Sequence, residues 1–321
     1  MGGERFRYVV GLLAGVALLF ALAKFVNVAD TIDSFVGYPW ERLPLILFVS
    51  LAYYLLKAAR WHYFLNVLGV RLSWRRSLLL YLAGQWFAFT PAGEFVRAYL
   101  LTGYGYSFSQ GSAAVTVQVV FDLLSLAIVG SIAIARFPEL AVLVLPFTAI
   151  FGSAVLVYAY WPLLTKRKRP QALAPRAGGL PLKHRSGFNE YSRQLLDWKP
   201  MLVGMALALP TVLVGAAVLF EVSRGFEIGL GLDGAAYVYS ISQLVGALSM
   251  LPHGLGAIEG SSVALFNYAS PGVDTARAAS AVVLFRLCTV GWSMVLGGLS
   301  MVLLRTSLAG TRAKSQVASG H

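Results

Sequence analysis

Six apolar runs dominate the chain, and each is long enough to cross a lipid bilayer as an α-helix. They are Tyr8–Asn27, Leu43–Phe64, Ser112–Arg136, Leu140–Tyr160, Met201–Phe220 and Ala278–Leu304. The bilayer core holds no water, so a spanning segment of about 20 residues must satisfy its own backbone hydrogen bonds, which a helix does. The sequence therefore predicts an all-α polytopic membrane protein with about six spanning helices.

The composition and the placement of charge agree with a membrane protein. Only 12% of the residues are charged and 58% are hydrophobic, whereas a soluble domain carries about 25% charged residues. The formal net charge of +12 could suggest nucleic acid, but the basic residues form short clusters between apolar runs, which is typical of cytoplasmic loops. We expect one membrane domain over residues 1–321 and no nucleic-acid partner.

Two further apolar segments, residues 77–101 and 235–268, are interrupted by breaks of similar composition. The first break is Phe89-Thr90-Pro91-Ala92-Gly93-Glu94, and the second is Leu251-Pro252-His253-Gly254-Leu255-Gly256-Ala257-Ile258-Glu259. Proline removes a helix donor, glycine allows close backbone approach, and a carboxylate is costly in lipid, so such breaks usually mark sites. We interpret each segment as a re-entrant helical hairpin, broken at Pro91, Gly93, Pro252, Gly254 and Gly256.

Loop charges give a topology with both termini in the cytoplasm. Basic clusters then fall inside at residues 71–76, 166–169 and 305–314, and the acidic loops fall outside, as the positive-inside rule requires. Three spans separate the hairpins, so the hairpins enter from opposite sides, as in inverted repeats formed by residues 8–160 and 200–304. Such repeats place the substrate site at their interface near the bilayer midplane.

Three segments have narrower interpretations. Arg5 and Arg7 precede the first apolar run, so a cleavable signal peptide is the alternative to a spanning helix there. The basic loop 165–199 is expected to be a flexible cytoplasmic linker, which either contacts anionic lipid headgroups or serves only as a topology determinant. Residues 305–321 are expected to form a cytoplasmic tail.

Glu94 and Arg97 are the first candidate site residues. They are three residues apart, so on a helix they share a face. A carboxylate beside a guanidinium is less costly to bury than either group alone. The pair either lines a polar cavity that meets a lipid headgroup or forms a structural ion pair that fixes the hairpin.

Four more charged residues are candidates within apolar sequence. Glu259 is either a proton or cation carrier or the partner of a buried arginine. Arg286 lies inside an apolar run, and its partner is either Glu259 or Asp122. Asp122 itself is either a helix–helix contact or a site residue. Arg60, next to Trp61, is the last candidate, whereas Lys57 is expected to extend its amine to the interface.

The sequence contains no pattern for a metal or a cofactor. Its single cysteine, Cys288, lies in an apolar run, and the four histidines are scattered. There is no nucleotide-binding loop and no Ser-His-Asp order. We therefore expect neither a metal nor a cofactor.

The motifs together resemble a known family. Arg60-Trp61, the run Pro91-Ala92-Gly93-Glu94-Phe95-Val96-Arg97, the run Pro252 to Glu259, and Leu284-Phe285-Arg286 resemble the lysylphosphatidylglycerol synthetase transmembrane region, also called the flippase-like integral membrane family. The resemblance extends from about Gly11 to Leu304. It implies an integral protein of the prokaryotic cytoplasmic membrane. In fused members of the family this region is credited with moving aminoacylated phospholipid between leaflets, while a separate soluble domain carries out the aminoacyl transfer.

The leading hypothesis is a flippase-like transporter and not an enzyme. It would move a polar or phosphate-bearing lipid, either a phospholipid or a polyprenyl-linked lipid, through a midplane cavity lined by the charged candidates. One alternative is a membrane-embedded enzyme acting on lipid-linked substrates, with Glu94 or Glu259 as general base. Another is a scaffold for a separate lipid synthase, which would dock on the basic loop 165–199.

Overall fold

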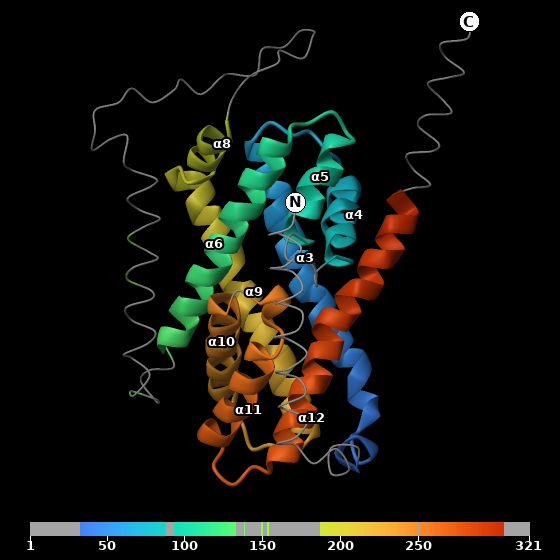
Figure 1. The fold of residues 1–321 in the computed structure, drawn as a ribbon, viewed down its shortest axis with the longest axis vertical. Coiled ribbons are helices and arrows are strands. Elements are labelled where there is room, and N and C mark those ends of the chain that lie inside the picture. The colour runs from blue at the N-terminus through green and yellow to red at the C-terminus, as the bar shows by residue number, and fades with distance from the viewer. Residues whose placement is uncertain are drawn as a thin grey trace, which may run out of the picture.

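Long helices form the framework of the protein. The computed structural model describes residues 33–87, 93–132, 187–249 and 251–304, with residues 138, 149 and 153. Every regular element within these residues is helical (Figure 1). Four helices there are long and apolar enough to cross a membrane, and they are α3 with the preceding turn η1 (Trp40–Arg42 and Leu43–Val67), α6 (Phe108–Ile132), α9 (Trp198–Gly225) and the helix from Thr275 to Leu304.

These four helices coincide with four of the predicted spans. Three of them are longer than predicted, whereas α6 begins four residues earlier than predicted and is no longer. The last one comprises α12 (Thr275–Arg286), a π-helical turn η5 (Leu287–Gly291) and a helical continuation to Leu304. The predicted span Tyr8–Asn27 lies outside the described residues. So does Leu140–Tyr160, apart from residues 149 and 153.

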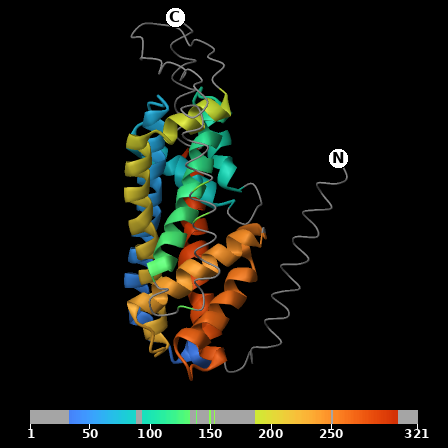
Figure 2. The same cartoon turned by 90° about the vertical axis from the view of Figure 1, so that its left-hand side faces the viewer.

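The two broken segments form two pairs of short helices at opposite ends of the bundle. The first pair is α4 (Trp74–Gln85) and α5 (Gly93–Thr102), and the second is α10 (Leu232–Leu248) and α11 (Ala257–Ala269). Figures 1 and 2 show α4 and α5 at the upper end and α10 and α11 at the lower end. At about 1.5 Å per residue, α4 and α5 rise only about 18 and 15 Å, which is less than the roughly 30 Å of a bilayer core.

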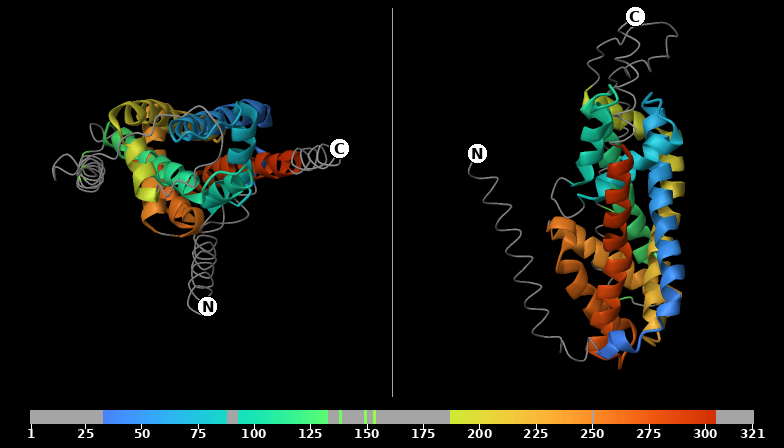
Figure 3. Two further views of the ribbon diagram at one scale, coloured as in Figure 1. Left: turned by 90° about the horizontal axis from the view of Figure 1, so that it is seen from above. Right: turned by 90° about the vertical axis from the view of Figure 1, so that its right-hand side faces the viewer.

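The long helices pack against one another over much of their length. α3 and α9 lie side by side (Figure 3), and α6 and α10 both pack against α9. Buried apolar side chains form two clusters. One includes Val212, Leu219, Val238, Phe266 and Phe285, and the other includes Trp61, Phe64, Tyr81, Leu101 and Phe121. Each broken pair thus packs against its own apolar cluster.

A glycine in the last helix allows the first short pair to dock closely. A Cβ atom at Gly297 would lie 2.6 Å from the backbone nitrogen of Trp86 and 2.8 Å from the carbonyl oxygen of Leu82. Helices in membranes often associate through such small residues, because the apolar effect does not drive them together in lipid. The C-terminal end of α4, just before the first break, is therefore held against the last long helix.

Part of the predicted linker is an ordered helix. Helix α8 (Phe188–Leu195) falls inside the segment 165–199 and packs against α6. Leu195 is fully buried, and Gln194 Nε2 donates a hydrogen bond to the Val67 carbonyl at 2.8 Å. The expectation of a flexible linker is therefore wrong for residues 188–195, because apolar contacts there favour a packed helix. Residues 165–186 lie outside the described part.

Candidate functional site

A carboxylate in the middle of α6 is shared by two cations of α3. Asp122 Oδ2 lies 3.1 Å from Lys57 Nζ, and Asp122 Oδ1 accepts a short hydrogen bond from Arg60. Lys57 is ten residues, or about 15 Å, from the end of α3, which is too far for its amine to reach the interface. The expectation that Lys57 extends to the interface is wrong, because the buried Asp122 supplies a nearer partner.

The second charged group lies on α5, directly after the first break. Arg97 Nη2 is 2.6 Å from Glu94 Oε2, so the predicted ion pair is present. Gly93 begins α5, and Pro91 lies outside the described residues. The Arg97 guanidinium sits over the rings of Trp61 and Tyr81, at 5.1 and 4.9 Å from their centroids. Cation–π contact of this kind holds a desolvated guanidinium in a fixed orientation.

The third group closes the second break. Three residues within this short stretch have positive φ, namely His253 at 53°, Gly254 at 64° and Gly256 at 80°. Glu259 Oε2 accepts the Gly256 backbone N–H at 2.5 Å, and Glu259 Oε1 lies 2.6 Å from Arg286 Nε. Glu259, not Asp122, is therefore the partner of Arg286.

Arg286 also satisfies the backbone of the break itself. Its Nη2 donates a hydrogen bond to the His253 carbonyl, at 3.1 Å, within the short turn η4 (Pro252–Gly254). A broken helix leaves carbonyl groups without intrahelical donors, and a buried carbonyl without a partner is costly. The Glu259–Arg286 pair thus has a clear structural role, since it binds both sides of the break.

The three groups lie close enough to interact. Glu94 interacts electrostatically with Lys57, Asp122 and His253. Tyr54 of α3 interacts electrostatically with both Lys57 and Arg286. Its hydroxyl donates a hydrogen bond to the Thr289 carbonyl at 3.1 Å. The six predicted residues Arg60, Glu94, Arg97, Asp122, Glu259 and Arg286 therefore converge from α3, α5, α6, α11 and α12 on one central region.

Hydrogen-bond donors remain in excess around the first break. Nε and Nη1 of both Arg60 and Arg97 are buried without an acceptor among the described residues, and so is Nε1 of Trp61. Arg60 is 0% and Arg97 1% exposed, whereas the Glu94 side chain is 41% exposed. Buried donors normally have partners. The geometry thus offers several N–H groups to the oxygens of an anion that enters beside Glu94.

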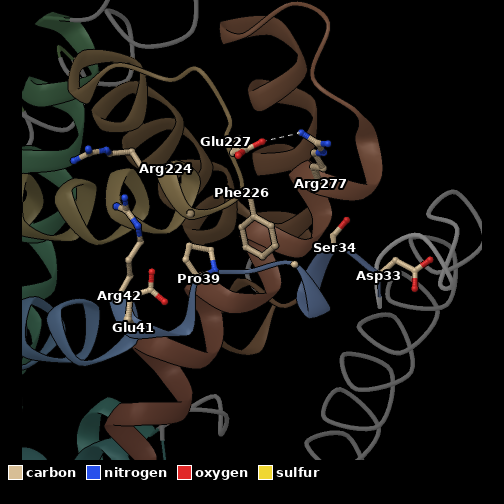
Figure 4. A pocket seen from close by; sticks show the side chains of 11 residues that line it. Asp33, Ser34, Pro39, Glu41, Arg42, Arg224, Phe226, Glu227 and Arg277 are labelled. Atoms are coloured by element: carbon tan, nitrogen blue, oxygen red, sulfur yellow. Dashed lines mark ion pairs between the residues drawn. The ribbon is translucent and has the colours of Figure 1, made fainter.

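A pocket of about 660 Å³ opens at the other end of the molecule. Arg42, Arg224 and Arg277 line it, as do Asp33, Glu41 and Glu227, so its formal charges cancel (Figure 4). The Arg277–Glu227 pair, at 3.9 Å, has side chains 52% and 86% exposed. Exposed ion pairs of this kind contribute little stabilising free energy. We therefore place the candidate site at the buried charges.

Several residues that shape the site are not among the candidates that the sequence indicates. Lys57 supplies an additional cation, the rings of Trp61 and Tyr81 hold Arg97, and Gln118 Nε2 donates to the Lys57 carbonyl at 3.0 Å. A signal for Lys57 existed, because Lys57 and Arg60 share a helix face within an apolar run and two buried cations require a carboxylate. The described residues contain no group of three His, Cys, Asp or Glu side chains that could hold a metal ion.

Long apolar helices around a buried charged centre define a multi-pass helical membrane protein. Comparison with known proteins gives the family. Residues 8–298 match the family described as the lysylphosphatidylglycerol synthase TM region, and the chain belongs to this family.

Curated relatives agree with this assignment. A UPF0104 membrane protein from Methanothermobacter thermautotrophicus is 25% identical over 305 residues, which cover 85% of this chain and 87% of the relative. A second UPF0104 membrane protein from that organism is 26% identical over 220 residues, which cover 61% of this chain and 64% of the relative.

Proposed function

We propose that the protein is a flippase-like lipid transporter, which moves a polar or phosphate-bearing lipid between leaflets through its charged centre. One observation carries this proposal. The Arg60 and Arg97 guanidinium groups are buried within the bundle, with N–H groups that lack acceptors in the described part of the chain. Intramembrane charge is costly and usually marks a substrate or ion pathway, and guanidinium groups match phosphate oxygens well.

The arrangement of the short helices supports the same proposal. The pairs α4–α5 and α10–α11 lie at opposite ends of the bundle (Figure 2). We interpret them as re-entrant hairpins that enter from opposite faces, with both termini in the cytoplasm and the protein in the cell membrane. Inverted repeats of this kind hold their substrate near the midplane and open to each side in turn.

The family name also favours a lipid substrate. The description refers to the membrane region of a synthase whose product is a phospholipid. For this chain we propose a membrane phospholipid or a polyprenyl-linked lipid as substrate. Anionic headgroups would contact the basic loop 165–199, and a separate lipid synthase would dock on the same loop.

Reconstitution tests the proposal. Purified protein in vesicles should move a fluorescent phospholipid from the inner to the outer leaflet, where an impermeant quencher destroys its signal. Arg97→Met should reduce this movement about tenfold or more, because a charge-assisted contact to the headgroup is lost. Arg277→Met is the matched control, since the Arg277 side chain is 52% exposed in a pocket away from the centre, and it should move lipid at the wild-type rate.

Two results would overturn the proposal that the protein is a lipid transporter. One is no movement above protein-free vesicles for phospholipids and polyprenyl phosphates alike. The other is equal loss of movement in Arg97→Met and Arg277→Met at equal amounts of folded protein. Size-exclusion elution and thermal melting of each variant establish that amount. Chemical modification of the lipid, seen by mass spectrometry, would indicate an enzyme instead.

A further inference from the structure

The charged centre carries an uneven number of cations and anions. Four cations meet there (Lys57, Arg60, Arg97 and Arg286) with three carboxylates (Glu94, Asp122 and Glu259), which leaves a surplus of one positive charge among the described residues. The other charged residues that the structure describes lie at or near helix ends. A surplus charge inside the bilayer is costly unless a counter-ion joins it.

The surplus arises at Asp122. Arg97 forms an ion pair with Glu94 and Arg286 forms one with Glu259, whereas Lys57 and Arg60 both pair with the single carboxylate of Asp122. Lys57 is also close enough to Glu94, at the start of α5, to interact with it electrostatically. The Lys57 side chain is 17% exposed, while that of Arg60 is 0% exposed. Lys57 is therefore the cation of this group that a ligand can more readily reach.

The unused hydrogen bonds point to the same ligand chemistry. Arg60, Trp61 and Arg97 carry five buried donor nitrogens that lack acceptors among the described residues. Within the same described part, Gln118 Oε1 is the one buried amide or carboxylate oxygen without a donor. A phosphate presents several oxygens to such donors, whereas the ammonium end of a zwitterionic headgroup would meet cations and unused donors.

We propose that the ligand of this centre is a lipid with a singly charged phosphodiester and no compensating cation, and that Lys57 sets this preference. This inference rests on the proposed function, and it names the substrate class of the same site. The lipid phosphate would supply the missing negative charge beside Asp122 and accept from the unused guanidinium donors. Zwitterionic and uncharged lipids would leave the surplus charge in place.

The test compares three lipids that share one fluorescent acyl chain and differ in headgroup. They are phosphatidylglycerol, phosphatidylcholine and an uncharged diacyl glucosylglycerol. Wild-type protein in vesicles should move phosphatidylglycerol about tenfold faster than the other two, as expected for one charge-assisted contact. Lys57→Met should remove this preference, chiefly by slowing phosphatidylglycerol, and Lys57→Arg should keep most of it.

A binding measurement tests the same headgroup preference independently of lipid movement. Purified protein in detergent is heated with each of the three lipids, and the shift in melting temperature is recorded. Phosphatidylglycerol should stabilise the wild type more than phosphatidylcholine, and Lys57→Met should lose the difference. Lys199→Met is the matched control, because Lys199 is exposed at the start of α9, and it should behave as the wild type in both assays.

The outcomes separate the two proposals. Movement of all three lipids at similar rates, or faster movement of phosphatidylcholine, would overturn the charge preference and leave the transporter intact. Equal slowing of all three lipids by Lys57→Met would also overturn it, since Lys57 would then act only on stability. No movement of any lipid, together with selective stabilisation by phosphatidylglycerol, would overturn the transporter but support the binding preference.

Discussion

Arg286 Nε lies 2.6 Å from Glu259 Oε1, and this ion pair joins the last long helix to the break between α10 and α11. The same two side chains engage the backbone of the break at Gly256 and His253. The pair thus fixes the second broken segment, whereas the Arg97–Glu94 pair at the first leaves guanidinium donors without acceptors among the described residues. Within that described part of the chain, the two segments therefore differ in how fully their polar groups are satisfied.

Removing either partner of the Glu259–Arg286 pair should destabilise the protein strongly. Glu259→Ala or Arg286→Met should each lower the free energy of unfolding by about 3–5 kcal/mol, because an uncompensated buried charge remains. The double variant should lose less than the sum of the two changes. Thermal melting in detergent measures all three.

An exposed ion pair provides the control for the Glu259 and Arg286 substitutions. Arg224→Met removes a partner of Glu221 at 3.5 Å, with the Arg224 side chain 51% exposed. It should cost below about 1 kcal/mol. Additive losses in the Glu259–Arg286 double variant would show that the two side chains act independently, contrary to the geometry.

Neutralising Asp122 should be more harmful than neutralising an exposed carboxylate. Asp122→Asn leaves Lys57 and Arg60 without their shared carboxylate, and we expect a loss of about 3–5 kcal/mol in stability. Adding Lys57→Met to this variant should recover part of the loss, because one unpaired cation is removed. Yield and melting temperature of purified protein report the effect.

Glu41→Gln serves as the comparison for Asp122→Asn, since Glu41 is exposed in the turn η1, just before α3 begins. We expect wild-type stability for it. If Lys57→Met made the Asp122→Asn variant less stable still, the assignment of Asp122 as the shared partner of both cations would have to be abandoned.

Arg97→Lys should impair lipid movement although it keeps the charge. Lysine cannot reproduce the planar contact with the rings of Trp61 and Tyr81 or the fixed donor geometry of guanidinium. We expect the rate of lipid movement in the vesicle assay to fall about tenfold, as for the loss of one desolvated cation–π contact. Lys199→Arg, an exposed exchange of the same type, should have no effect. Wild-type rates for Arg97→Lys would mean that charge alone matters there.

Two glycines with positive φ should respond differently to alanine. Gly272, at φ 92°, has open space around its Cβ position, so Gly272→Ala should cost only about 1–2 kcal/mol of backbone strain. At Gly254, φ 64°, a Cβ would lie 2.7 Å from Ile258 Cδ1 and 2.9 Å from Gly246 Cα. Gly254→Ala should therefore cost about 1–3 kcal/mol more. Similar melting temperatures for the two variants would contradict the close packing at the second break.

Much of the helical framework follows from the sequence. Runs of apolar residues the length of a bilayer can satisfy their backbone only as helices, so α3, α6, α9 and the helix from Thr275 to Leu304 were predictable. Proline and glycine locate the breaks by local backbone preference, and the helix pairs α4–α5 and α10–α11 follow within a few residues. Helix α8 was not predicted, because its order depends on burial of Leu195 against distant helices.

The residue types and their positions in apolar runs show which side chains are costly in lipid and must find partners. The identity of each partner depends on how the helices pack. Arg286 could have paired with Glu259 or Asp122, and the packing of α11 against α12 chose Glu259. Lys57 could have extended to the interface, and the packing of α6 against α3 placed Asp122 within its reach. The choice depends on contacts between residues far apart in the chain, and local propensity and hydrophobic pattern do not contain that information.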